Sequence, residues 1–490
     1  MSTSRREIVP FVEVEYEMTP FDAEAETRTL LFVPHHGPVL SVDEESGTAI
    51  SLIWTGNRVT TDGNFLTELM AASTVDEGRQ AATNVTSIGQ NWVMIDTEGS
   101  IGWFPYNQVP IREWASMDNP TFLPLPGDGS AEWDGILPYE DLPQAYNPEA
   151  GWIATANNDM TGALMDGDPY NESSTPLQVY SATGYRAFRI HELLEAQLGA
   201  HDPQTMLDTV GDVTSAVGQD LAPLFIGLTI GETPLSDAAQ LLSDTLDGWQ
   251  GTCPTGLDGI DASGPASSDG SLVAEAAGCT AFHVMFGQLY DGVFADEVAA
   301  AGVERRPSRT TLIRLLLSPE TLENGESYWD DVSTEIIETP QDIGVAAADA
   351  AGAWLTAELG PEPSDWLWGR VHTLTLRADL FNSFGIPTFN NGPFANDGGL
   401  YTVDVANPGD MVGHNYTQSA GASTRFVCRA PATGVRCTVQ LPGGQRHYRD
   451  SENYDDLFRR YLLNQEVDLG FDIVEAAANA ASSVTFAPTE

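Results

Sequence analysis

The order of hydrophobic patterns along the chain restricts its fold more than any other feature. Residues 1–186 alternate largely as strands do, for example at 29–33, and a hairpin is expected over 92–104 with turn residues at its centre. Residues 187–360 carry helical spacing, and alternation returns over 361–490. Strands, then helices, then strands indicate an α+β protein in which one sheet-based core is interrupted by a mainly helical insertion.

The helical signal is clearest over residues 236–249. Leu242, Leu246 and Trp249 fall on one face there, and Ser236 stands where it can cap the first turn. We interpret these apolar stripes as core packing. Comparable patterns lie at residues 273–301, 310–317 and 343–359.

The last third of the chain is predicted to form short strands followed by a helix. Apolar and polar residues alternate over each of the expected strands. The strands are predicted at residues 371–376, 401–405, 424–428 and 436–441, and the helix at 455–463.

The four cysteines fall into two pairs. Cys428 and Cys437 flank a turn-rich stretch between two alternating runs, where a bridge could pin a hairpin. Cys253 and Cys279 bracket a loop rich in Gly, Ser and Asp, and closing this loop would stabilise the fold mainly by constraining the unfolded chain. Neither pair has CxxC spacing and no histidine cluster accompanies them, so disulfides are favoured over zinc, with buried free thiols as the alternative.

The charge balance excludes several classes of partner. The sequence holds 71 acidic and 21 basic residues, a net charge of −50, and none of the basic residues is lysine. Such a chain repels phosphate and anionic lipid, so no nucleic-acid or membrane partner is expected. Its acidity is interpreted as solubility in a salty or extracellular medium. Together with the cysteines this favours a periplasmic or extracellular location, although residues 1–10 contain no secretory signal.

Generic catalytic motifs give no functional assignment. The sequence contains no GxSxG, P-loop, HExxH or GxGxxG motif. The eight histidines are scattered except for His35 and His36, which abut a Gly-Pro turn. For this pair we favour packing over metal ligation.

A set of motifs in a fixed order carries the functional signal. Residues 123–129 (LPLPGDG), 133–138 (WDGILP) and 151–158 (GWIATANN) are followed much later by 368–375 (WGRVHTLT) and 441–445 (LPGGQ). Their order and spacing resemble the penicillin acylase family of N-terminal-nucleophile hydrolases, which includes acyl-homoserine lactone acylases. The resemblance implies an αββα-type core, incomplete in this chain and interrupted by the helical insertion.

The resemblance also implies an activity, the hydrolysis of an amide bond in an N-acylated small molecule. In that family a serine at the start of the large subunit attacks the carbonyl, its own α-amino group serves as the base, and the chemistry needs no cofactor. By position Asn157 matches the side-chain donor to the oxyanion, and Arg186 matches an arginine that orders the active site. Asp168 is matched to a calcium-ligating aspartate of the family, which implies a structural calcium ion, but from the sequence we favour a solvated aspartate in an acidic loop.

The nucleophile is where the sequence departs from the family. Residues 5–29 already resemble a point well inside the large subunit, and nothing matches the strands that should follow the catalytic serine. Removal of Met1 would expose Ser2, but no apolar strand follows Ser2, so it is not expected to be the nucleophile. Two hypotheses follow: the chain acts with a missing N-terminal half or small subunit that bears the serine, or it is a non-catalytic subunit or remnant used in binding or assembly.

Overall fold

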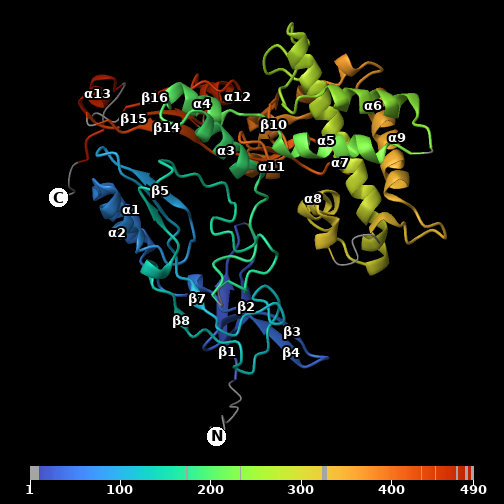
Figure 1. Ribbon diagram of the computed structural model, residues 1–490. Helices are drawn as coiled ribbons and strands as arrows, with labels where there is room; N and C mark the ends of the chain where they lie inside the picture. The colour runs from blue at the N-terminus through green and yellow to red at the C-terminus, as the bar shows by residue number, and fades with distance from the viewer. Residues whose placement is uncertain are drawn as a thin grey trace. The chain divides into compact units, whose positions relative to one another are not determined.

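The chain divides into two compact units, each described by itself. The first unit comprises Met1–Ala182 with Ala430–Gly434, and the second comprises Thr183–Arg429 with Val435–Glu490. The three-part division at 186 and 360 expected from the sequence stays a prediction. The computed structural model describes residues 10–486, except 22, 173–174, 232, 323–327, 432, 447, 471–472 and 481–483 (Figure 1).

A four-stranded antiparallel sheet opens the first unit. Its strands follow chain order: β1 (Val12–Met18), β2 (Glu26–Val33), β3 (Gly37–Asp43) and β4 (Thr48–Ser51). The strand predicted at 29–33 is confirmed as part of β2. None of the side chains on these four strands is buried, so this sheet does not form the core of the unit.

The core of the first unit lies between two helices and a smaller sheet. The predicted hairpin is confirmed, because β5 (Trp92–Ile95) and β6 (Ile101–Phe104) pair from Trp92 opposite Phe104 to Ile95 opposite Ile101. Phe65 and Val75 bury against Phe104 in this core. The remaining elements are α1 (Asp62–Ala71), α2 (Val75–Ala82), β7 (Pro110–Ile111), β8 (Gly135–Ile136) and β9 (Ala145–Tyr146).

Helices dominate the first part of the second unit, as the sequence predicted (Figure 1). The long helix α7 (Gly270–Ala301) is apolar on all sides and packs against α6 (Asp237–Gly248) and α9 (Pro340–Glu358), which is typical of a helix at the centre of a core. The Ser236 hydroxyl accepts the Ala239 N–H at 3.2 Å and so caps α6. The other helices of this part are α3 (Tyr185–Ala196), α4 (Pro203–Val210), α5 (Ala216–Leu228) and α8 (Arg309–Leu317).

Short strands and helices complete the second unit. The predicted strands at 424–428 and 436–441 are confirmed as β14 (Arg425–Arg429) and β15 (Arg436–Gln440), which pair with each other and with β16 (Val467–Leu469). The rest are α10 (Trp368–Val371), β10 (Thr373–Leu376), α11 (Asp379–Ser383), β11 (Asn391–Ala395), β12 (Ala406–Pro408), β13 (Gln418–Gly421), α12 (Asp456–Leu462) and α13 (Ile473–Ala478).

The strand predicted at 401–405 is wrong, because this segment is a buried turn that ends where β12 begins. Tyr401 has a left-handed backbone with φ of 59°. The Thr402 hydroxyl donates to the Asp404 carbonyl at 2.6 Å and accepts the Gly399 N–H at 3.0 Å. These local bonds satisfy backbone groups that a strand would have paired with a neighbour.

Both predicted disulfides are present. Cys253 bonds to Cys279, and Cys428 bonds to Cys437 across β14 and β15. All four cysteines are therefore used, and the alternative of free thiols is not supported. Within the described part of the chain, no helix combines the length and the apolar character needed to cross a membrane.

Candidate functional site

Asn157 lies in a sharp turn of the first unit. Its φ of 59° is in the left-handed region, which asparagine tolerates better than most residues with a Cβ. Its carbonyl oxygen accepts the Ala182 N–H at 2.7 Å, which fixes the turn to a segment 25 residues further along. The backbone at Asn157 is thus held by the turn and by this hydrogen bond.

The residues that follow Asn157 hold the turn with local hydrogen bonds. The Asn158 side-chain oxygen accepts the Ala156 N–H at 3.0 Å. The Asp159 carboxylate accepts the N–H groups of Thr161 at 3.0 Å and Leu164 at 2.8 Å. Burial alone would raise the pKa of Asp159, but these hydrogen bonds lower it below its usual value, so the group stays ionised at neutral pH.

Asn157 lines an open hollow of about 310 Å³ in the first unit. The buried Trp103 forms part of its wall and donates its indole N–H to the Asn91 side chain at 2.8 Å. The lining residues include no ionisable side chain, and amides supply most of the polar groups. Such a surface can donate to a carbonyl or an oxyanion without titrating. The amides are Gln90, Asn91, Asn107, Asn157, Asn158 and Gln178.

A larger hollow lies in the second unit but carries none of the predicted site residues. It measures about 780 Å³ and lies along β14, β15 and β16, beside Arg429, Arg436 and Asp468. The larger volume therefore favours the hollow in the second unit, whereas the predicted oxyanion donor lies in the hollow of the first unit. We favour the smaller hollow, because Asn157 is part of its wall.

Arg186 stands near the start of α3 in the second unit. Its side chain is half-buried, and burial lowers its pKa from the usual value. One turn further along, Arg189 donates to both carboxylate oxygens of Asp212, at 3.1 and 2.8 Å, and so anchors α3. Because Arg186 and Asn157 belong to different units, the roles predicted for them stay predictions.

Asp168 takes part in local hydrogen bonds in the part of the chain that the structure describes. Its carboxylate accepts the Tyr170 N–H at 2.9 Å, and its own N–H donates to Asp166 at 3.0 Å. It does not converge with two other candidate metal-ligating side chains among those residues, whereas calcium takes six to eight oxygen ligands. The calcium site stays a prediction. Ser2 lies outside the described residues.

A buried charge cluster in the second unit was not predicted from the sequence. Arg425 forms an ion pair with Asp404, and their side chains are 4% and 0% exposed. Burial, followed by the negative charge of Asp404, raises the pKa of Asp397 to about 7. Arg425 is the first residue of β14, and the sequence pattern of a strand does not reveal that an arginine within it is buried.

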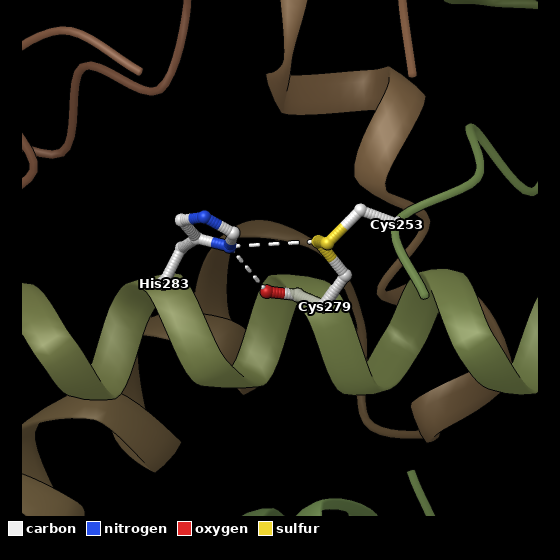
Figure 2. Close-up of side chains that lie close together, drawn as sticks. All are labelled: Cys253, Cys279 and His283. Atoms are coloured by element: carbon white, nitrogen blue, oxygen red, sulfur yellow. Dashed lines mark hydrogen bonds between the residues drawn. A yellow bond between two sulfur atoms is a disulfide. The ribbon is translucent and has the colours of Figure 1, made fainter. Parts of the chain in front are cut away.

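Cys253, Cys279 and His283 also lie close together, on α7 and the loop before it (Figure 2). The two sulfurs are bonded to each other and so offer no thiolate to a metal. The His283 Nδ1–H donates to the Cys279 carbonyl at 2.8 Å, and Nε2 accepts the Leu400 N–H at 3.0 Å. Burial lowers the pKa of His283 to about 3, so the ring is neutral and structural.

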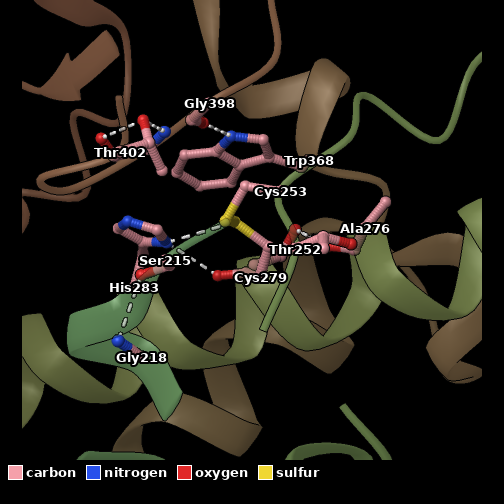
Figure 3. Close-up of a disulfide and its surroundings, with 12 residues drawn as sticks. Ser215, Gly218, Thr252, Cys253, Ala276, Cys279, His283, Trp368, Gly398 and Thr402 are labelled. Atoms are coloured by element: carbon pink, nitrogen blue, oxygen red, sulfur yellow. Dashed lines mark hydrogen bonds between the residues drawn. A yellow bond between two sulfur atoms is a disulfide. The ribbon is translucent and has the colours of Figure 1, made fainter. Parts of the chain in front are cut away.

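The disulfide in this group lies among buried side chains of the second unit (Figure 3). The His283 ring stacks on the Trp368 ring with centroids 4.4 Å apart. The Trp368 indole donates to the Gly398 carbonyl at 2.7 Å. We therefore assign this group to the core and not to the functional site.

Comparisons with known proteins cover nearly the whole chain. A family model described as Penicillin amidase matches residues 3–476. Penicillin G acylase of Escherichia coli is 30% identical over 260 residues, which are 50% of this chain and 27% of that protein. Acyl-homoserine lactone acylase QuiP of Pseudomonas putida is 25% identical over 409 residues, which are 82% of this chain and 46% of that protein.

A solved structure shows the same fold. The thermostable penicillin G acylase from Alcaligenes faecalis matches with a TM-score of 0.65 and 19% sequence identity. The match covers 98% of this chain and 82% of that chain. By contrast, the chain spans less than half the length of either curated relative, 27% of one and 46% of the other.

Proposed function

Because this chain belongs to the penicillin amidase family, whose members have the N-terminal-nucleophile hydrolase fold, we propose that it forms part of an enzyme that hydrolyses the amide bond of an N-acylated small molecule. The observation that supports this proposal most directly is the position of Asn157 in the wall of the hollow in the first unit. Asn157 matches the family's oxyanion donor in the sequence, and it lines a hollow whose polar groups are mostly neutral amides. A donor to a developing charge has to be positioned before the substrate binds, and the turn constrains the backbone that carries this side chain.

The proposed nucleophile is a serine that does not belong to this chain and is carried by an N-terminal half or a small subunit. The short coverage of the relatives supports this arrangement, since most of each relative lies beyond the matched part. That partner would also complete the αββα core. The two disulfides are consistent with an oxidising compartment, and we propose a periplasmic or extracellular location.

The proposed reaction has two steps. The serine Oγ attacks the amide carbonyl carbon while its proton passes, through a water, to the serine's own α-amine. The Asn157 Nδ2–H donates to the resulting oxyanion, the C–N bond breaks, and the amine leaves with the proton. Water then cleaves the acyl ester, which releases the carboxylic acid and restores the serine. In this scheme Arg186 helps to order the site.

Reconstitution tests the proposal. The chain is assayed alone and with a candidate N-terminal half, using penicillin G and an N-acyl-homoserine lactone as substrates. Asn157→Gly removes the Nδ2 donor and keeps the left-handed backbone, so we expect kcat to fall by about 10²–10³-fold with little change in KM. The matched control is Gln90→Ala, which removes another exposed amide of the same hollow.

Two outcomes would count against the proposal. If the Asn157→Gly variant were as active as the wild type, Asn157 would not be the oxyanion donor. No hydrolysis with any N-terminal half would favour the second hypothesis, a non-catalytic subunit used in binding or assembly.

A further inference from the structure

Two adjacent histidines and a distant glutamate converge on the surface of the first unit. His35 and His36 lie in the turn between β2 and β3, and Glu132 lies between β7 and β8. The His36 Nε2 atom is 2.9 and 3.0 Å from the two Glu132 carboxylate oxygens, and the His35 Nε2 atom is 3.9 Å from the nearer one. One donor atom from each residue lies within 4.8 Å of the other two.

The spacing of these donor atoms suits a tetrahedral metal ion. Zinc binds imidazole nitrogen at about 2.0–2.1 Å and carboxylate oxygen at about 2.0–2.2 Å, which puts neighbouring ligand atoms about 3.4 Å apart. The distances from Glu132 to His36 and His35, 2.9 and 3.9 Å, lie on either side of that value. Small side-chain rotations would bring both to it.

A hydroxyl group behind His36 supports the ligand role. The His36 Nδ1 atom lies 3.3 Å from the Ser51 hydroxyl. That hydroxyl can accept a hydrogen bond from the Nδ1–H, and in this tautomer the Nε2 lone pair is directed at Glu132. Without a cation or a proton between them, the lone pair and the carboxylate would repel each other. Metal-ligating histidines are commonly oriented by such a partner on the other ring nitrogen.

The cluster is accessible to ions from solvent. The side chains of His35, His36 and Glu132 are 56%, 19% and 40% exposed. The net charge of −50 attracts cations to the surface in general, but two imidazoles select transition metals over calcium and magnesium. The sequence favoured packing for the histidine pair, whereas the structure places His36 in polar contacts with Ser51 and Glu132.

We propose that His35, His36 and Glu132 bind one divalent first-row transition-metal ion, with zinc as the reference ion and water in the fourth position. The ion would link the turn between β2 and β3 to the segment between β7 and β8. This site is independent of Asn157 and of the proposed hydrolysis.

Zinc titration of the untagged full chain tests the site. Calorimetry is run in 1 M NaCl with excess Mg²⁺, which competes for the acidic surface, and one high-affinity Zn²⁺ ion per chain is expected. His35→Ala removes an exposed ligand, and Glu132→Gln removes the anionic donor but keeps an oxygen that His36 can contact. Each change should weaken binding at least tenfold. Glu113→Gln, which changes an exposed carboxylate outside the cluster, should leave binding within twofold of wild type.

Cobalt gives a second measurement that depends on coordination. Co²⁺ bound through two imidazoles and a carboxylate should absorb in the visible range, and His35→Ala should abolish this absorption while the circular dichroism spectrum stays native. Two results would overturn the proposal: no saturable Zn²⁺ site in the wild type, or affinities of His35→Ala and Glu132→Gln within twofold of wild type.

Discussion

Replacing Arg425 should destabilise the second unit strongly. Its guanidinium forms an ion pair with the fully buried Asp404 and donates to the Gln440 side chain at 3.3 Å, the Tyr461 carbonyl at 3.1 Å and the Asn464 side chain at 3.0 Å. Arg425→Met keeps an apolar chain of similar length but leaves the Asp404 charge buried without its partner. Breaking a buried pair in this way costs about 3–5 kcal/mol, a large part of a typical stability of about 5–15 kcal/mol.

Urea unfolding followed by tryptophan fluorescence measures the loss. The matched control is Arg436→Met on the neighbouring strand, where the arginine is exposed and the expected change is within about 0.5 kcal/mol. The double variant Arg425→Met/Asp404→Asn should recover part of the loss, because it also removes the unpaired charge. If Arg425→Met costs no more than Arg436→Met, the cluster does not stabilise the fold as argued.

Three further predictions concern stability. Burial and the charge of Asp404 raise the pKa of Asp397 to about 7, so the folded state holds a proton that the unfolded state releases near pH 4. The unfolding free energy should therefore fall by up to about 1.4 kcal/mol per pH unit as the pH rises from about 4 to 7. The variant Asp397→Asn should show a smaller slope in the same pH series. Raising NaCl from about 0.1 to 1 M shortens the Debye length from about 10 to 3 Å and screens the repulsion among the acidic side chains of a chain with net charge −50. Calorimetry should therefore give a higher Tm at 1 M NaCl, and an unchanged Tm would contradict this. Replacing both Cys253 and Cys279 by alanine opens a loop of sequence separation 26. By the chain-entropy relation this should lower the free energy of unfolding, measured in urea, by about 3.5 kcal/mol. A decrease below about 1 kcal/mol would refute that account.

Elements with strong local signals could be predicted from the sequence. Helix α6 begins after Ser236 because its hydroxyl caps the first turn, and the apolar face of the helix repeats at helical spacing. The hairpin of β5 and β6 forms around the turn residues expected for it. In these cases the local preference and the tertiary fold agree, which is why a single sequence sufficed.

The alternation of apolar and polar residues at 401–405 did not produce a strand, because side-chain hydrogen bonds determine the backbone conformation there. Thr402 satisfies the backbone groups of Gly399 and Asp404 within the turn, and Tyr401 takes a left-handed conformation. A pattern of apolar and polar residues contains neither fact. The burial of Arg425 was hidden for a similar reason, since it depends on contacts from β15 and α12 and not on neighbours in sequence.

The candidate site could be located only through the family motifs. Composition and spacing gave Asn157 no distinction among the many amides of the chain. Its left-handed backbone, its bond to Ala182 and the amides around it come from segments separated by up to about ninety residues, such as Gln90 and Gln178. No local rule brings such segments together.

The most direct test of the central claim is intact-mass analysis and N-terminal sequencing of this protein purified from its native source. Amide hydrolysis is followed through every fraction. We predict that peptides of this chain elute with the activity, together with a chain or an extended form that begins with a serine other than Ser2. An active preparation made up only of a chain that begins at Met1 or Ser2 would contradict the account, as would complete separation of this chain from the activity.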